Sequence, residues 1–220
     1  MHFRISVMAA ACGILSLAGC GGGDGNDRPQ AVTTQILSDP RFDGDIEQTS
    51  QSSFTVTQGM SPTVQSVLAG IDPVGGTEFR AFLDFPLTGS GGVPGNASID
   101  SAFLELYVDD LQPTGGRLPL RVDLVAFQPP TLLETDFDRT LQPALASVIV
   151  SPDISSPDVG TSVPIDVTSL MVEAQRQGLV DFQVRIMEDS GPAIAVLMVI
   201  DDSTGANRPS HAPLLTVTYF

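Results

Sequence analysis

The sequence predicts an all-β protein, an antiparallel β-sandwich of jelly-roll type with one short helix. The clearest strand covers residues 78–87, where apolar side chains occupy every second position from Phe79 to Leu87. That period of two is typical of a half-buried strand. Residues 101–109 repeat the pattern after a glycine-rich loop, and the 21 glycines and 17 prolines are spread along the chain, which suits many short strands.

Other strands are expected from alternating or continuously apolar stretches. Pro119 places one of them at a sheet edge, because proline cannot donate a hydrogen bond to a neighbouring strand. Residues 153–164 are expected to form a loop. The expected strands are residues 53–58, 63–71, 118–126, 147–150, 180–186, 193–200 and 214–219.

One helix is expected to close an end of the sandwich. Apolar residues recur at helical spacing from Val167 to Ala174. Asp166 or Thr168 can cap the start by accepting backbone N–H bonds, and Gly178 ends the helix. With 220 residues, 42% of them hydrophobic, the chain is long enough for one domain with a substantial core.

The amino terminus predicts a secretion signal over residues 1–19. It contains His2 and Arg4, an apolar run too short to span a bilayer, and small residues before Cys20. Residues 17–20, Leu-Ala-Gly-Cys, resemble the bacterial lipobox, which implies that Cys20 receives a diacylglyceryl group. The alternative is an ordinary signal peptide with an incidental cysteine, but the spacing and the glycines that follow argue against it.

The lipobox resemblance implies a protein anchored to a membrane by lipid. Residues 20–31 then form a flexible tether and residues 32–220 the sandwich domain. Gly21 follows the cysteine where an aspartate would favour retention at the inner membrane, so the outer membrane or cell surface is expected for a Gram-negative source. Cys12 leaves with the signal, and neither a disulfide nor thiol chemistry is expected afterwards.

The charge balance excludes one class of partner. Aspartate and glutamate number 26 against 10 arginines and no lysine, for a formal net charge of −16. Such a field repels phosphate backbones, so nucleic acid is not an expected partner. A solvated, soluble surface is the ordinary explanation of this acidity.

Several segments in chain order resemble the DNRLRE or disaggregatase-related carbohydrate-binding modules. The resemblance implies a β-sandwich of an extracellular protein that binds polysaccharide. Members usually carry tryptophan where this chain has Phe137 and Met171 or Val172, and the chain contains no tryptophan. The similar segments are residues 79–85, 99–107, 133–137, 165–168 and 212–219.

Nothing in the residues indicates an enzyme. His211 is the only histidine left after removal of the signal, and no serine lies in a Gly-x-Ser-x-Gly motif. The spacing of the residues gives no support to a Ser-His-Asp triad. The chain has so many carboxylates that a glycosidase pair could be chosen in many ways, and no one pair is favoured. A hydrolase or lyase would need a deep cleft lined by carboxylates and His211.

Calcium is the best metal candidate, because it takes several carboxylate and carbonyl oxygens. Four acidic residues cluster around Gly44 and two follow a predicted buried strand, so the two groups are expected to meet. Acidic turns that simply face solvent are the ordinary alternative. The candidate ligands are Asp39, Asp43, Asp45, Glu47, Asp201 and Asp202.

A sugar site would need aromatic faces together with polar groups. Phe82, Phe103 and Tyr107 fall on the outward phase of the first two strands and could form a platform, unless loops cover them. Arg80, Arg121 and Arg185 are also outward and could bind acidic sugars. Ion pairs with neighbouring acidic side chains such as Glu78, Glu105 and Asp123 are the ordinary alternative.

The sequence therefore predicts a non-catalytic envelope lipoprotein that binds polysaccharide or presents a surface structure. The alternative is a structural or adhesive lipoprotein that contacts an envelope protein and has no glycan ligand. The absence of tryptophan favours this alternative, whereas the family resemblance favours polysaccharide.

Replacing Cys20→Ala should move the protein from the membrane fraction to the soluble fraction, because the thiol that carries the lipid is gone. Fractionation followed by immunoblotting measures this. A variant that stays with the membranes would contradict lipid anchoring.

Overall fold

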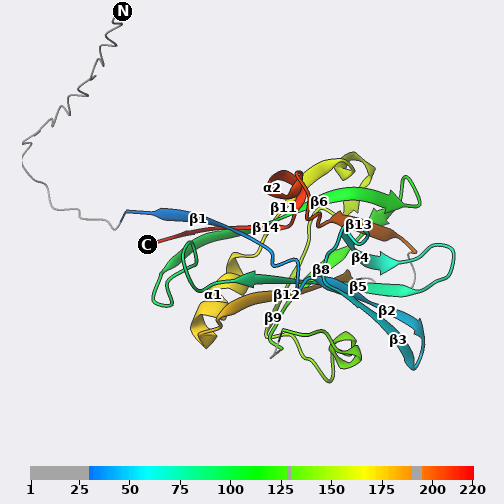
Figure 1. Ribbon diagram of the computed structural model, residues 1–220, viewed down its shortest axis with the longest axis horizontal. Helices are drawn as coiled ribbons and strands as arrows, with labels where there is room; N and C mark the ends of the chain where they lie inside the picture. Colours follow the sequence, from blue (N-terminus) through cyan, green and yellow to red (C-terminus); the bar gives the residue numbers. More distant parts are fainter. Residues whose placement is uncertain (1–29, 128–129, 190–194) are drawn as a thin grey trace, which may run out of the picture.

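The computed structural model describes residues 30–127, 130–189 and 195–220. They form a curled antiparallel sheet whose two halves face each other as a sandwich (Figure 1). The all-β prediction is confirmed. The predicted signal sequence and Cys20 lie outside the described residues, whereas the predicted start of the domain at residue 32 coincides with the first strand.

The first layer is built around one long strand, β6. Its first half pairs with β14 and its second half with β13, while β11 pairs along its other edge. Leu104 of β6 therefore lies between Leu215 of β14 and Ile165 of β11. The layer contains β1 (Val32–Leu37), β14 (Leu214–Tyr219), β6 (Ile99–Gln112), β11 (Thr161–Asp166), β13 (Leu197–Asp201) and β4 (Ser66–Ile71).

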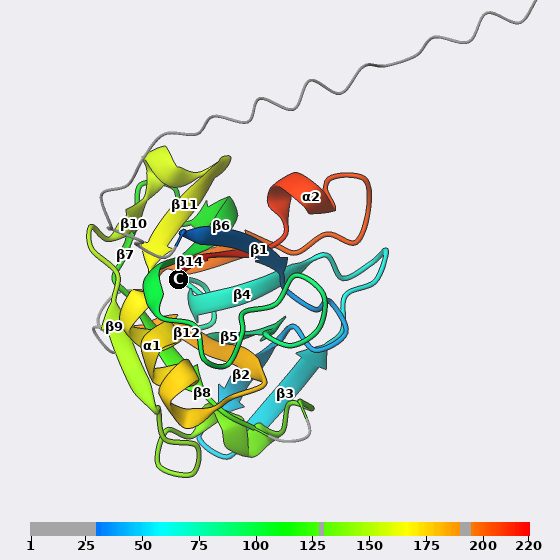
Figure 2. The ribbon, with the colours of Figure 1, turned by 90° about the vertical axis from the view of Figure 1, so that its left-hand side faces the viewer.

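The second layer is built around β5, the strand that the sequence marks most clearly. β5 pairs with β12 along one edge and with β2 along the other, and its first two residues also pair with β4, which connects the layers. Figure 2 shows the two layers on opposite sides of the molecule. This layer contains β3 (Ser53–Gln58), β2 (Gly44–Ser50), β5 (Glu78–Pro86), β12 (Asp181–Glu188), β8 (Leu120–Val125) and β9 (Ala146–Ile149).

The main core lies between the layers and is closed at one end by α1 (Thr168–Gln177) (Figure 2). Leu170, Met171 and Ala174 of α1 are buried in it. The Asp166 carboxylate accepts the N–H of Thr168 at 2.9 Å, and Gly178 ends the helix with a positive φ of 66°. A residue with a side chain rarely adopts that conformation, so the predicted helix and its end are confirmed together.

Two local predictions are wrong. β8 pairs with both β9 and β12, so it is not the edge strand that Pro119 suggested. Pro119 lies just before β8, where no ladder hydrogen bond is required. The predicted loop over residues 153–164 contains β10 (Ile154–Ser155), paired with β7 (Arg117–Leu118), then the turn η2 (Ser156–Asp158) and the start of β11.

A second, smaller core covers the outer face of the second layer. The connection from β8 to β9, which contains η1 (Glu134–Phe137), packs over that face. It buries Phe82 of β5 completely, and the Phe82 and Phe127 rings meet edge to face at 6.2 Å. Its buried members are Ile46, Phe82, Val125, Phe127, Leu132 and Phe137.

Phe82→Ala should lower the free energy of unfolding by about 3–5 kcal/mol, because it opens a cavity in this second core. Phe103→Ala is the matched control, since Phe103 is 39% exposed on β6 and should cost about 1 kcal/mol or less. Urea unfolding of the two variants measures the difference. Equal costs would show that Phe82 is not covered in solution.

Candidate functional site

A groove crosses the outer face of the second layer beside the second core. It consists of three adjoining hollows of about 540, 370 and 270 Å³ that share lining residues. The two larger hollows are within the size range of small-ligand sites. We call it the arginine groove and define it by Gln48, Gln51, Phe54, Glu78, Arg80, Phe137, Asp138, Arg139, Glu188 and Asp189.

An aromatic pair forms one wall of the arginine groove. The rings of Phe54 and Phe137 lie 5.1 Å apart, and the Arg80 guanidinium lies 3.9 Å from the centre of the Phe137 ring. Arg80 also donates to the Glu78 carboxylate at 2.7 Å and to the backbone carbonyl of Phe137. Phe54 is partly exposed, so a rigid wall presents an aromatic surface to solvent.

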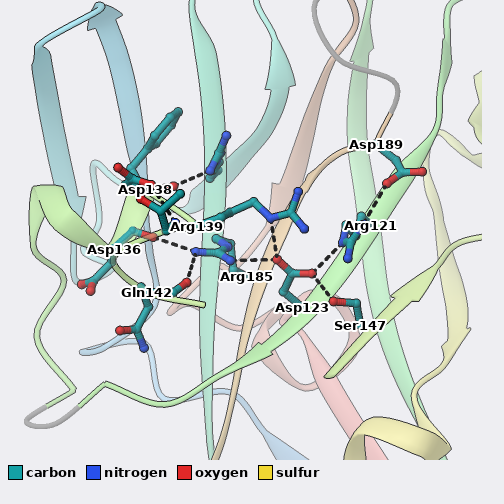
Figure 3. Close-up of polar contacts among 12 residues, drawn as sticks. Arg121, Asp123, Asp136, Asp138, Arg139, Gln142, Ser147, Arg185 and Asp189 are labelled. Carbon is teal, nitrogen blue, oxygen red and sulfur yellow. Dashed lines mark hydrogen bonds and ion pairs between the residues drawn. The ribbon is translucent and has the colours of Figure 1, made fainter. Parts of the chain in front are cut away.

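A fully buried carboxylate, Asp123 of β8, lies beside Arg139, one of the residues that line the groove (Figure 3). Arg185 and Arg121 each donate to it at 2.8 Å, and the Ser147 hydroxyl donates at 2.6 Å. Burial by itself would raise the pKa of Asp123, but the hydrogen bonds from Ser147, Arg185 and Arg121 outweigh burial and lower the pKa. Asp123 therefore remains ionised and anchors the surrounding arginines.

Arg185 of β12 connects this carboxylate to the β8–β9 connection. Its side chain is fully buried, and Nη1 donates to the backbone carbonyls of Asp136 at 3.0 Å and Gln142 at 3.1 Å. Burial lowers the pKa of Arg185, and the bond to Asp123 opposes that shift. The connection is thus fastened to the sheet on both sides of Arg139, whose Nε lies 3.6 Å from Asp123.

Side chains of both charges line the arginine groove. Asp138 is exposed, and hydrogen bonds from Thr140 lower its pKa, so it stays anionic. The side chain of Arg139 is 42% exposed, and its Nη atoms make no hydrogen bond to any described residue. Together with the amides of Gln48 and Gln51, the groove therefore offers hydrogen-bond donors and acceptors side by side.

The predicted aromatic platform is not assembled. Phe82 is buried under the β8–β9 connection, which corrects its assignment to an exposed sugar site. Phe103 and Tyr107 lie on β6 in the other layer, and the Tyr107 ring stacks on His211 at 3.9 Å with an angle of 6° between the planes. The alternation of apolar and polar residues in β5 predicted correctly which face of the strand carries Phe82, but it could not show that another segment covers that face.

Arg80 lines the groove and Arg121 does not, but both are already paired. Arg185, the third arginine predicted to face outward, is fully buried and paired with Asp123, which corrects its assignment to a sugar site. Arg80 contacts Glu78, and Arg121 contacts Asp123 at 2.8 Å and Asp189 at 3.6 Å. The ordinary alternative of ion pairs with neighbouring carboxylates therefore holds for all three. Arg139 was missed, because it lies in an irregular segment where no periodicity indicates a direction.

The predicted calcium ligands do not form one group. Asp39 pairs with Arg41, the Asp45 carboxylate accepts the N–H of Leu68 at 3.2 Å, and Asp201 lies 3.0 Å from His211. Among the described residues, no three acidic, histidine or cysteine side chains converge as metal ligands would. Of the predicted ligands in the two segments, Asp43 and Asp202 come together, and their carboxyl groups are neighbours.

His211 lies in the short helix α2 (Arg208–His211), away from the arginine groove. Its Nδ1 is 3.0 Å from the Asp201 carboxylate and its ring stacks on Tyr107. In the described part of the chain, no serine hydroxyl forms a hydrogen bond with it. These contacts give His211 a packing role.

No family model matches the chain, and no curated protein matches it significantly. Within the residues that the structure describes, no helix has both the length and the apolar character needed to cross a bilayer.

Asp123→Asn should lower the free energy of unfolding by about 3–5 kcal/mol, because it leaves the buried Arg185 without its anionic partner. Asp189→Asn is the control and should cost less than about 1 kcal/mol, since Asp189 is partly exposed and its contact with Arg121 is long. Denaturant unfolding of both variants at neutral pH tests this. A small cost for Asp123→Asn would mean that the buried pair is not needed to hold the connection.

Proposed function

We propose that this protein binds a neutral polysaccharide in the arginine groove, as a non-catalytic lipoprotein of the cell envelope. The observation that carries the proposal is the open groove itself, in which a partly exposed aromatic wall adjoins fixed groups of both charges. The resemblance of the sequence to carbohydrate-binding modules supports the same ligand class.

The groups in the arginine groove match the chemistry of a sugar. A pyranose presents C–H groups that pack on an aromatic face, and hydroxyls that both donate and accept hydrogen bonds. Phe54 offers the aromatic surface, Gln48 and Gln51 offer amides, and Arg139 and Asp138 offer a donor and an acceptor. The hollows adjoin one another across the sheet, so they suit several linked sugars better than one enclosed unit.

The charges favour a neutral ligand over an acidic one. Glu78 holds Arg80, and Asp123 holds Arg121, so these arginines are not available to bind carboxylate groups of a ligand. Asp138 and Asp189 also line the groove, and the whole chain carries a formal charge of −16. A polyanion would be repelled by this surface.

The same geometry supports binding without catalysis. The hollows are surface depressions, and His211 does not line them. The anchoring that the lipobox resemblance implies is compatible with the domain, because β1 begins at an exposed residue, Val32. A tethered domain of this kind would hold polysaccharide close to the membrane.

A protein partner is the second candidate, and one observation favours it. β9 is the last strand of the second layer and pairs only with β8 among the described strands. Ile149 of β9 is 64% exposed beside a hollow lined by Val148, Asp166, Thr168 and Ser169. An unpaired strand edge with apolar side chains is a common site of strand addition by another chain.

Binding of the purified protein to an array of neutral and acidic glycans tests the proposal. A neutral polysaccharide should bind, and Arg139→Ala or Gln51→Ala should each weaken it, the arginine change by about tenfold or more because a hydrogen bond to a charged group is lost. Isothermal titration calorimetry measures the affinities.

Arg176→Ala is the matched control, because Arg176 lies on α1, outside the groove, and pairs with Glu173 of the same helix. It should bind like the unchanged protein. If the folded protein binds no glycan, the proposal fails and the second candidate function, binding of a protein partner, is favoured. Binding confined to acidic glycans would contradict the neutral ligand.

A further inference from the structure

Two aspartates meet in the interior at a place that the proposed groove does not use. Asp43 belongs to the connection between β1 and β2, and Asp202 follows β13 near the end of the chain. Both side chains are fully buried. Two carboxylates taken out of water next to each other are costly unless something compensates their charge.

Two of the four carboxyl oxygens of this pair accept hydrogen bonds from other residues. Asp43 Oδ1 accepts the N–H of Asp84 at 2.8 Å. Asp202 Oδ1 accepts from Arg208 Nη1 at 3.1 Å and from the Ser38 hydroxyl at 3.5 Å. Oδ2 of Asp43 and Oδ2 of Asp202 are buried and have no hydrogen-bond partner.

Calcium does not fit these unpartnered oxygens. The ion requires six to eight oxygen ligands, but three of the other four predicted ligands make contacts elsewhere: Asp39 with Arg41, Asp45 with a backbone N–H, and Asp201 with His211. The fourth, Glu47, lies within β2 opposite Thr55 and Phe79 and joins no group of metal-ligating side chains among the described residues. The Arg208 guanidinium also contacts Asp202 and, through Nη2, the Ser38 carbonyl. A cation already occupies one side of the pair.

We propose that Asp43 and Asp202 share a single proton between their Oδ2 atoms, and that this acid–carboxylate pair fastens the β1–β2 connection to the segment after β13. We call it the Asp43–Asp202 pair. One O–H donated by Asp43 to Asp202 satisfies both unpartnered oxygens, adds no other atom, and leaves one negative charge for Arg208 to balance.

The surrounding charges agree with this protonation. Burial and the charge of Asp202 raise the pKa of Asp43 well above its ordinary value. Burial raises the pKa of Asp202 to about 6, although Asp43 and Arg208 oppose the shift. Asp43 is therefore the member of the pair that keeps the proton.

Other titratable groups lie near the pair. Asp39 is held ionised by Arg41, which lowers its pKa. Burial raises the pKa of Asp84 to about 6, with Asp181 and Asp39 adding to the shift, and raises that of Asp45 to about 7. Asp201, next to Asp202 in the chain, raises the pKa of Asp202 further and pairs with His211.

The pair makes stability depend on pH in a defined direction. A carboxyl whose pKa is raised on folding holds a proton that the unfolded chain has already released, so stability is full in acid and falls as pH rises. Asp84 and Asp202 are mostly ionised above pH 7, but Asp45, whose pKa is raised to about 7, still releases its proton there. The contribution of Asp43 is therefore the difference in pH dependence between the unchanged protein and a variant that lacks only the Asp43 carboxyl. Loss of the Asp43 proton leaves two buried negative charges beside one arginine, and the connection should detach.

Asp43→Asn tests the proposal, because an amide N–H can replace the shared O–H and cannot ionise. Between pH 7 and 9, the equilibrium constant for unfolding of the unchanged full chain should rise more steeply than that of Asp43→Asn, by up to about tenfold per pH unit. Asp109→Asn is the control, since Asp109 is exposed on β6, and it should keep the steep rise.

Two further measurements on the unchanged protein do not depend on a variant. Carbon NMR of the Asp43 carboxyl should show a pKa far above 4, and calcium chloride or a chelator should leave the melting temperature unchanged. Equal pH slopes for Asp43→Asn and the unchanged protein, or an ordinary pKa for Asp43, would overturn the proposal. Stabilisation by calcium that Asp43→Asn abolishes would instead assign a cation to this place.

Discussion

The buried ion pair between Asp123 and Arg185 is the interaction on which the candidate site depends. It lies inside the second layer, and Arg185 extends from it to two backbone carbonyls of the β8–β9 connection. Because both groups are fully buried, the cost of removing them from water must be offset by several hydrogen bonds at once. Ser147 and Arg121 donate further hydrogen bonds to Asp123, although the buried Arg185 Nε has no partner among the described residues. The result is a connection held in one position over the sheet.

That position gives the second layer two buried faces. One face packs against the first layer in the main core, and the other is covered by the second core around Phe82 and Phe137. The arginine groove lies where this covering ends, so its walls are rigid on one side and open to water on the other. Binding groups that are already fixed lose little conformational entropy when a ligand arrives.

The charge of the folded protein near neutral pH also differs from the formal charge that its acidic composition gives. Burial raises the pKa of Asp84 and Asp202 to about 6 and of Asp45 to about 7, so several carboxyl groups in the interior are not fully charged near neutral pH. The arginines divide between two uses. Arg185 and Arg208 compensate buried carboxylates, whereas Arg176 lies on the surface beside Glu173.

The sequence by itself determined the sandwich, the phase of its main strands and the helix that ends at Gly178, because period-two alternation and a glycine at a helix end are local signals. It did not reveal β1, β2, β10 or β11, whose few or irregularly spaced apolar residues give no clear alternation, and η1 carries no periodic pattern. Only the tertiary structure decided that a connection covers Phe82, that Arg139 faces the groove, and that Asp43 meets Asp202. These depend on contacts between residues far apart in the chain, and the free energy of such contacts comes from burial and charge compensation that no local pattern encodes.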